Sequence, residues 1–111
     1  MNIQIFGKAK CFDTKKAQRW FKERGIKFQN IDMAEKGISK GELSSVLAAV
    51  KSIEALTDTK AAGSEIVRFL ASEEAKFEKL LENPKFIKTP IVRNGKFATV
   101  GYMPDIWKNW E

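Results

Sequence analysis

The pattern of the first 32 residues restricts the possible folds of this chain more than any other feature of its sequence. A short β-rich run from Asn2 to Phe6 ends at Gly7, and a second run from Lys27 to Asp32 alternates polar and apolar side chains, as a half-buried strand does. Between the two runs the apolar residues change to helical spacing, at Ala17, Trp20 and Phe21. A strand, a helix and a strand within about 30 residues predict a crossover unit with two parallel strands, which is typical of an α/β sheet.

The rest of the chain predicts a helical segment followed by a hairpin. Ser39, with Glu42 three residues later, has the spacing of a capping box and indicates a helix start. Helical patterns continue to about residue 82, and Asn94-Gly95 between two β-rich runs predicts a hairpin with a type I′ turn. We therefore expect residues 1–111 to form one domain in the order βαβ, a helical insertion over approximately residues 39–82, and ββα.

Composition excludes several classes of function. The 20 lysine and arginine residues exceed the 14 aspartate and glutamate residues, for a net charge of +6, but they are spread along the chain, so we expect no direct binding of nucleic acid. We also expect a cytoplasmic chain without membrane contact, because no apolar run is long enough to span a bilayer and no signal peptide is evident. The absence of histidine excludes Cys-His dyads and most zinc sites, so no metal is expected.

Cys11 is the only cysteine, and its place in the pattern suggests chemistry. It follows the first strand and directly precedes the helix, where free N–H groups and the helix dipole stabilise an anion. Lys8, Lys10 and Lys15 add positive charge, and the hydroxyl of Thr14 can donate to the sulfur. Two interpretations stay open at this point: a reactive thiolate, or a buried and inert cysteine that packs like alanine.

Several motifs resemble the arsenate-reductase-like family, which contains the ArsC reductases and the Spx-type transcription regulators. The first half carries Gly7-(x)3-Cys11-(x)2-Thr14-Lys15-Lys16-Ala17 and then Trp20-Phe21-Lys22-Glu23-Arg24-Gly25-Ile26. The second half carries Asn83-Pro84-Lys85-Phe86-Ile87-Lys88-Thr89-Pro90-Ile91-Val92 and later Val100-Gly101-Tyr102. The resemblance implies a thioredoxin-like α/β fold, close to glutaredoxin, with a mixed four-stranded sheet and a helical insertion between the halves.

The resemblance also assigns roles to single residues. It makes Cys11 the active-site thiol and Pro90 the cis-proline before the third strand. Thr89 stands where the reductases carry an oxyanion-binding arginine, and Lys60 is nearest to a second such arginine in the insertion. The sequence leaves open whether Lys60 reaches the site, and whether Arg93 does, because the alternation of a strand can turn its side chain away.

Three hypotheses about function follow from the resemblance. The first is a thiol-dependent oxidoreductase in which Cys11 attacks a small oxyanion or a mixed disulfide, with glutathione as a co-substrate or with glutaredoxin or thioredoxin as the reductant. The second is an Spx-like regulator that binds the RNA polymerase α subunit, although Thr14 stands in place of the second cysteine of the redox switch. The third is a non-catalytic member that only binds a thiol or a partner. No bound cofactor is expected in any of the three.

Overall fold

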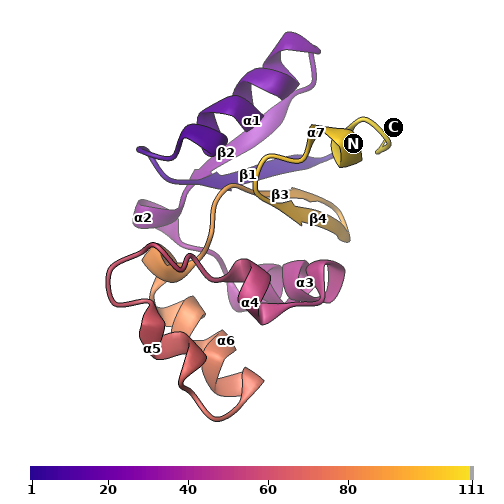
Figure 1. Cartoon of the computed structure of the whole chain (residues 1–111). Coiled ribbons are helices and arrows are strands. Elements are labelled where there is room, and N and C mark those ends of the chain that lie inside the picture. The colour runs from indigo at the N-terminus through magenta and orange to yellow at the C-terminus, as the bar shows by residue number, and fades with distance from the viewer. Residues whose placement is uncertain (111) are drawn as a thin grey trace.

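A mixed four-stranded sheet forms the framework of the chain, and the computed structural model describes residues 1–110. The strands are β1 (Ile3–Gly7), β2 (Phe28–Asp32), β3 (Ile91–Asn94) and β4 (Phe97–Val100). They lie in the order β2-β1-β3-β4 (Figure 1). β1 runs parallel to β2, as the strand–helix–strand pattern predicts, and β3 runs antiparallel to both β1 and β4. The expected thioredoxin-like α/β fold is thus confirmed.

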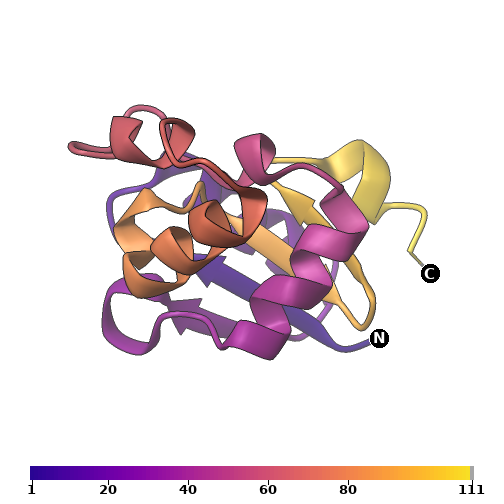
Figure 2. The ribbon, with the colours of Figure 1, turned by 90° about the horizontal axis from the view of Figure 1, so that it is seen from below.

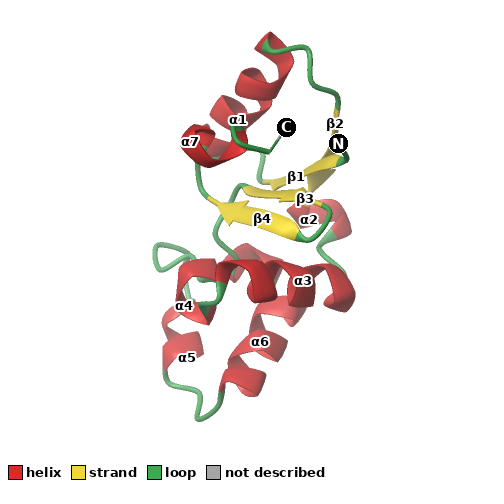
Figure 3. Cartoon of the chain, turned by 90° about the vertical axis from the view of Figure 1, so that its right-hand side faces the viewer, coloured by secondary structure: helices red, strands yellow, loops and turns green. Residues whose placement is uncertain are grey.

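Helices cover both faces of this sheet. On one face lie α1 (Phe12–Glu23) and α7 (Pro104–Trp107), and on the other lie the helices that connect β2 to β3 (Figures 1 and 3). The connecting segment contains α2 (Met33–Lys36), α3 (Lys40–Val50), α4 (Ile53–Leu56), α5 (Glu65–Arg68), α6 (Glu73–Glu82) and the short 3₁₀ helix η1 (Pro84–Phe86). Figure 2 shows α3 crossing the strands on this second face. No helix in residues 1–110 is long and apolar enough to span a membrane.

Alternation along the strands supplies a separate core on each face. Ile3 and Ile5 of β1 point to the core under α1 and α7, whereas Phe6 points to the core under the connecting helices. Neighbouring residues of β3 divide in the same way, Ile91 to the second core and Val92 to the first. We call these two the α1-side core and the insertion-side core. The end of β1, where the site lies, is therefore held between two packed layers.

The predicted capping box is confirmed, but the predicted type of the hairpin turn is wrong. The Ser39 hydroxyl accepts from the Glu42 N–H at 3.1 Å, and the Glu42 carboxylate accepts from the Ser39 N–H at 3.0 Å. In the hairpin, Asn94 pairs with Phe97, so the two loop residues are Gly95 and Lys96. Of these two only Gly95 has a positive φ, which is the pattern of a type II′ turn and not of type I′.

Candidate functional site

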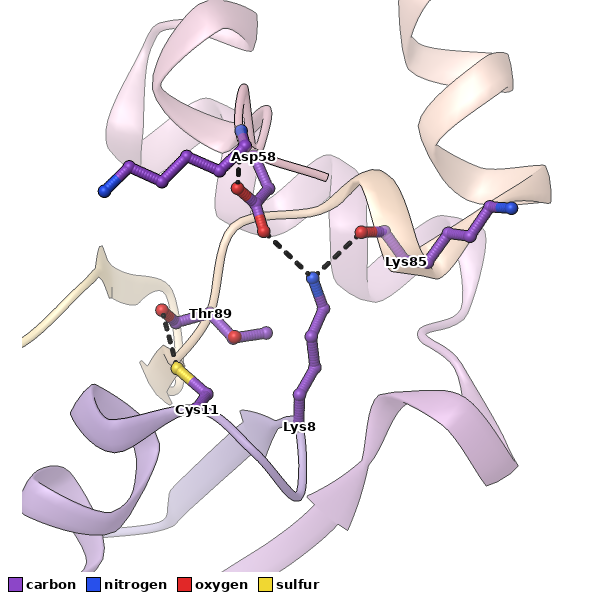
Figure 4. A network of polar contacts seen from close by, with 6 residues as sticks. Lys8, Cys11, Asp58, Lys85 and Thr89 are labelled. Atoms are coloured by element: carbon purple, nitrogen blue, oxygen red, sulfur yellow. Dashed lines mark hydrogen bonds and ion pairs between the residues drawn. The ribbon is translucent and has the colours of Figure 1, made fainter. Parts of the chain in front are cut away.

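Cys11 occupies the N-cap of α1, at the mouth of the loop that leaves β1. Its backbone is extended (φ −90°, ψ 114°), and its N–H donates to the Lys8 carbonyl at 3.1 Å, which tightens the loop before the helix. The side chain is half-buried, and Sγ donates to the Thr89 carbonyl at 3.5 Å (Figure 4). A cysteine in this position does not fit the interpretation of an inert core residue.

Hydrogen bonds to the sulfur make Cys11 more acidic than an ordinary cysteine. Partial burial alone raises the pKa of the thiol, because it disfavours the charged form. The hydroxyls of Thr14 and Thr89 and the backbone N–H groups of Thr14 and Asp13 outweigh this effect, so the pKa of Cys11 is lowered. The thiolate, which is the nucleophilic form, is thereby favoured in the folded chain.

Thr14 owes its position to the absence of a side chain at Gly7. A Cβ on Gly7 would lie about 2.2 Å from Thr14 Cγ2 and 2.9 Å from Oγ1, so the two residues pack directly on each other. Thr14 is 4% exposed, and its Oγ1 has no hydrogen-bond partner while Cys11 is a neutral thiol that donates to Thr89. The hydroxyl is therefore free to donate to the sulfur once Cys11 loses its proton.

An open pocket of about 470 Å³ surrounds the thiol and carries more positive than negative charge. Its lining residues are Lys8, Lys10, Cys11, Phe12, Asp13, Asp58, Lys60, Lys88 and Thr89. Within residues 1–110, Lys10, Lys60 and Lys88 form no ion pair, so their charges are available to an anion in the pocket. Lys60 of the insertion thus reaches the site.

Lys8, by contrast, is occupied as a bridge between the β1–α1 loop and the insertion. Its Nζ donates to the Lys85 carbonyl at 2.9 Å and lies 3.4 Å from Asp58 Oδ2 (Figure 4). Asp58 also accepts from the Lys60 N–H at 3.0 Å, through its other carboxylate oxygen. This chain of contacts ties the position of Lys60 to the loop that carries Cys11.

The segment before β3 forms the wall opposite the thiol. The Thr89–Pro90 peptide bond is cis, as the resemblance implied, and Pro90 is buried. The Pro90 carbonyl accepts from the Gly101 N–H at 2.8 Å, which joins this segment to the residue after β4. The Thr89 carbonyl accepts a hydrogen bond from the Cys11 thiol, and a hydrogen bond from the Thr89 hydroxyl to the sulfur lowers the pKa of Cys11.

Two residues considered from the sequence lie away from this pocket. Lys15 lines a separate hollow of about 190 Å³ that faces β2, together with Asn30 and Asp32. Arg93 donates to the Gln4 side chain at 2.7 Å and does not line the thiol pocket. The part of the chain that the structure describes contains no cluster of three or more metal-ligating side chains.

Four residues of the pocket lie outside the site predicted from the sequence: Phe12, Asp13, Asp58 and Lys88. Lys88 lies two residues before Pro90, so its place in the motif around the expected proline was a usable signal. Phe12 adjoins Cys11 and is 79% exposed, which makes it an apolar contact surface beside the thiol. Asp58 had no such signal, because only the packing of the insertion brings it to Lys8.

This chain matches a family model and a curated relative over most of its length. The model of the ArsC family matches residues 6–110. The global transcriptional regulator Spx 2 of Oceanobacillus iheyensis is 31% identical over an alignment of 111 positions, which covers 95% of this chain and 80% of that protein.

Solved structures extend the likeness to the whole architecture. An ArsC-family related protein from Bacteroides fragilis has a TM-score of 0.88 at 20% identity, with 100% of this chain and 98% of that chain covered. The arsenate reductase from Vibrio cholerae has a TM-score of 0.83 at 24% identity, with 96% and 94% covered. At these identities the two structures establish a common fold and no more.

Proposed function

Because this chain belongs to the ArsC family, we propose that it is a thiol-dependent oxidoreductase that uses Cys11 as the nucleophile and glutathione as the reductant. The observation that carries the proposal is the lowered pKa of a half-buried Cys11 that opens into a lysine-lined pocket. A thiolate at the N-terminus of a 12-residue helix is a suitable attacking group for disulfide exchange.

A single thiol requires a two-step exchange. In the first step the Cys11 thiolate attacks the glutathione sulfur of a mixed disulfide; a Cys11–glutathione disulfide forms, and the other thiol leaves as a thiolate that takes up a proton. In the second step a free glutathione thiolate attacks this new disulfide, which releases oxidised glutathione and restores the Cys11 thiolate. In the net reaction one mixed disulfide and one free glutathione give one free thiol and one oxidised glutathione, and no second cysteine of the chain is needed.

The charges of the pocket support glutathione more than a tetrahedral oxyanion. Lys10, Lys60 and Lys88 are separate point charges that suit the carboxylates of a tripeptide. An oxyanion such as arsenate is better held by the paired donors of arginine, and no arginine lines this pocket within residues 1–110. Since glutathione chemistry needs a reducing compartment, we expect the chain to work in the cytoplasm.

The decisive experiment measures glutathione-dependent reduction of a glutathione mixed disulfide, coupled to glutathione reductase and NADPH. We expect turnover in the wild type and none in Cys11→Ser, while circular dichroism shows the same fold in both. Lys88→Ala and Lys60→Ala should raise the KM for glutathione several-fold. Lys27→Ala, which removes an exposed charge outside the pocket, is the matched control.

Two other outcomes would replace the proposal. Turnover that persists in Cys11→Ser would place the chemistry elsewhere in the chain. Glutathione binding without any turnover of the mixed disulfide would indicate the non-catalytic member of the family. A parallel assay with arsenate as the oxidised substrate separates an arsenate reductase from a general disulfide reductase.

The 31% identity to Spx 2 supports a second candidate function, that of a transcriptional regulator. The resemblance to Spx-type proteins implies the RNA polymerase α subunit as the partner. Retention of the purified chain on an immobilised α C-terminal domain tests this, and retention should survive Cys11→Ser because a binding surface does not need the nucleophile. The absence of retention at micromolar concentrations would argue against the regulator.

A further inference from the structure

The helical insertion contains a second cavity, which the chemistry of Cys11 does not use. It has a volume of about 370 Å³, within the lower range of small-molecule pockets. It lies between α4, α5 and α6, and its buried apolar wall includes Ile53 and Val67, which are 1% and 2% exposed. An apolar side chain of a small ligand would be well accommodated there.

One polar group on the cavity wall lacks a partner. Ser64 lines the cavity, is 2% exposed, and its Oγ forms no hydrogen bond within the described residues. A buried hydroxyl left without a hydrogen-bond partner is unfavourable, so this group favours a ligand that can pair with it. Thr57 on the same wall differs, because its hydroxyl already donates to the Ile53 carbonyl at 2.9 Å.

The rim carries one free charge of each sign. Glu65 and Arg68 lie three residues apart on α5 and both line the cavity, and neither forms an ion pair in the part of the chain that the structure describes. The other two rim charges, Glu54 and Lys76, are already paired with each other at 3.6 Å. A ligand that matches the free pair therefore carries an ammonium and a carboxylate close together.

We propose that this cavity binds a free α-amino acid with an apolar side chain. Its side chain fills the space beside Ile53 and Val67, its carboxylate meets Arg68, and its ammonium group meets Glu65. A carboxylate oxygen can also accept the hydrogen bond that Ser64 lacks.

This site shares a wall with the thiol pocket. Along the loop after α4, Thr57 and Thr59 line the amino-acid cavity, whereas Asp58 and Lys60 line the pocket of Cys11. A ligand that shifts this loop therefore shifts Lys60, and with it the contact between Asp58 and Lys8. Occupancy of the cavity should consequently change the reactivity of Cys11. This change does not depend on the proposed function; only its effect on catalytic turnover rests on it.

Titration of the full-length chain with L-leucine, followed by amide shifts in ¹⁵N NMR spectra, tests the site. We expect saturable shifts at Ser64, Val67 and Arg68 at millimolar concentrations. Arg68→Gln and Glu65→Gln should each weaken binding at least about tenfold, while Glu78→Gln on α6, outside the cavity, should leave it unchanged. The single-charge analogues 4-methylpentanoate and isoamylamine should bind at least about tenfold more weakly than L-leucine.

Absence of shifts up to 10 mM L-leucine, about the weakest affinity worth assigning to a site, would overturn the proposal. So would equal binding of 4-methylpentanoate, or binding that neither Arg68→Gln nor Glu65→Gln affects.

Coupling is tested by the rate of Cys11 alkylation with iodoacetamide, with and without saturating L-leucine. We expect a change of at least about twofold in the wild type and none in Arg68→Gln. An unchanged rate despite bound leucine would overturn the coupling. Because the NMR titration does not involve the thiol, a loss of the redox activity would leave the binding result intact, and the two proposals can fail separately.

Discussion

Replacement of Gly7 by alanine tests whether the shape of the β1–α1 junction controls the acidity of Cys11. The new Cβ would lie about 2.2 Å from Thr14 Cγ2, whereas non-bonded carbon atoms prefer about 3.5–4.0 Å. Thr14 must therefore move by about 1.3 Å, from 2.2 Å to about 3.5 Å, or rotate about its χ1 angle. Either movement displaces the hydroxyl from the position in which it can donate to the deprotonated Cys11 sulfur.

Both stability and acidity should change. Overpacking of this kind costs about 1–3 kcal/mol, and the gain from a less flexible unfolded chain offsets only about 0.4–1 kcal/mol. We therefore expect the free energy of unfolding of Gly7→Ala to fall by about 1–2 kcal/mol. The pKa of Cys11 should rise, because one of the groups that lower it is displaced while the effect of burial remains.

Urea unfolding and the pH profile of iodoacetamide alkylation measure the two effects. Thr14→Ser removes the methyl group at 2.2 Å and keeps the hydroxyl, whose oxygen lies 2.9 Å from the new Cβ. The double variant Gly7→Ala/Thr14→Ser should therefore regain part of the stability and a lower pKa of Cys11 than Gly7→Ala alone. Gly41→Ala is the matched control: a Cβ there meets nothing within 4 Å, and alanine should stabilise α3 by about 0.5–1 kcal/mol. An alkylation midpoint in Gly7→Ala equal to that of the wild type would refute the argument.

Three further predictions concern charge and packing. Because the pKa of Cys11 is lowered in the folded chain, its stabilisation is complete above the unfolded pKa of about 8.5 and is lost as the pH falls through the folded pKa. The difference in unfolding free energy between the wild type and Cys11→Ser should therefore grow from about pH 6 to 9, and a constant difference would contradict the lowered pKa. Lys8→Met, which removes the bridge to the insertion, should cost about 1–2 kcal/mol in urea unfolding, whereas Lys16→Met at an exposed pair should cost no more than about 0.5 kcal/mol; equal costs would show that the bridge contributes nothing. Trp107→Phe removes the 2.7 Å hydrogen bond from the indole to buried Thr99 and should cost about 2–4 kcal/mol, of which a second change, Thr99→Val, should restore about 1 kcal/mol; a cost below about 1 kcal/mol would mean that this bond is unimportant.

The sequence could predict those parts of the fold that depend on the pattern of neighbouring residues. The strand–helix–strand unit and the start of α3 depend on the spacing of apolar residues and on one capping box, and both are present as expected. The hairpin turn depends on more than its own residues. Although Asn94-Gly95 favours a type I′ turn, the pairing of Asn94 with Phe97 extends β3 by one residue and moves the turn to Gly95 and Lys96.

The same distinction holds for the site. Cys11 could be located because the residues that place it, the end of β1 and the start of α1, are its neighbours in sequence. Lys15 is also a neighbour in sequence, but the rotation of about 100° per residue along α1 turns it toward β2. Asp58 could not be placed, because its position depends on two long-range backbone hydrogen bonds between the insertion and the segment before β3. They run from Asp58 N–H to Phe86 O and from Lys88 N–H to Leu56 O, and both are 2.7 Å long.

The division of the interior into two cores has a consequence for spectroscopy. All three tryptophans of the chain, Trp20, Trp107 and Trp110, belong to or pack against the α1-side core, and none lies in the insertion. Tryptophan fluorescence therefore follows the melting of the α1-side core. Most helical residues belong to the connecting segment that contains α3 and α6, so the far-ultraviolet helix signal follows mainly the other layer. Recorded on one sample, the two signals report whether the α1-side layer and the connecting helices unfold together or in sequence.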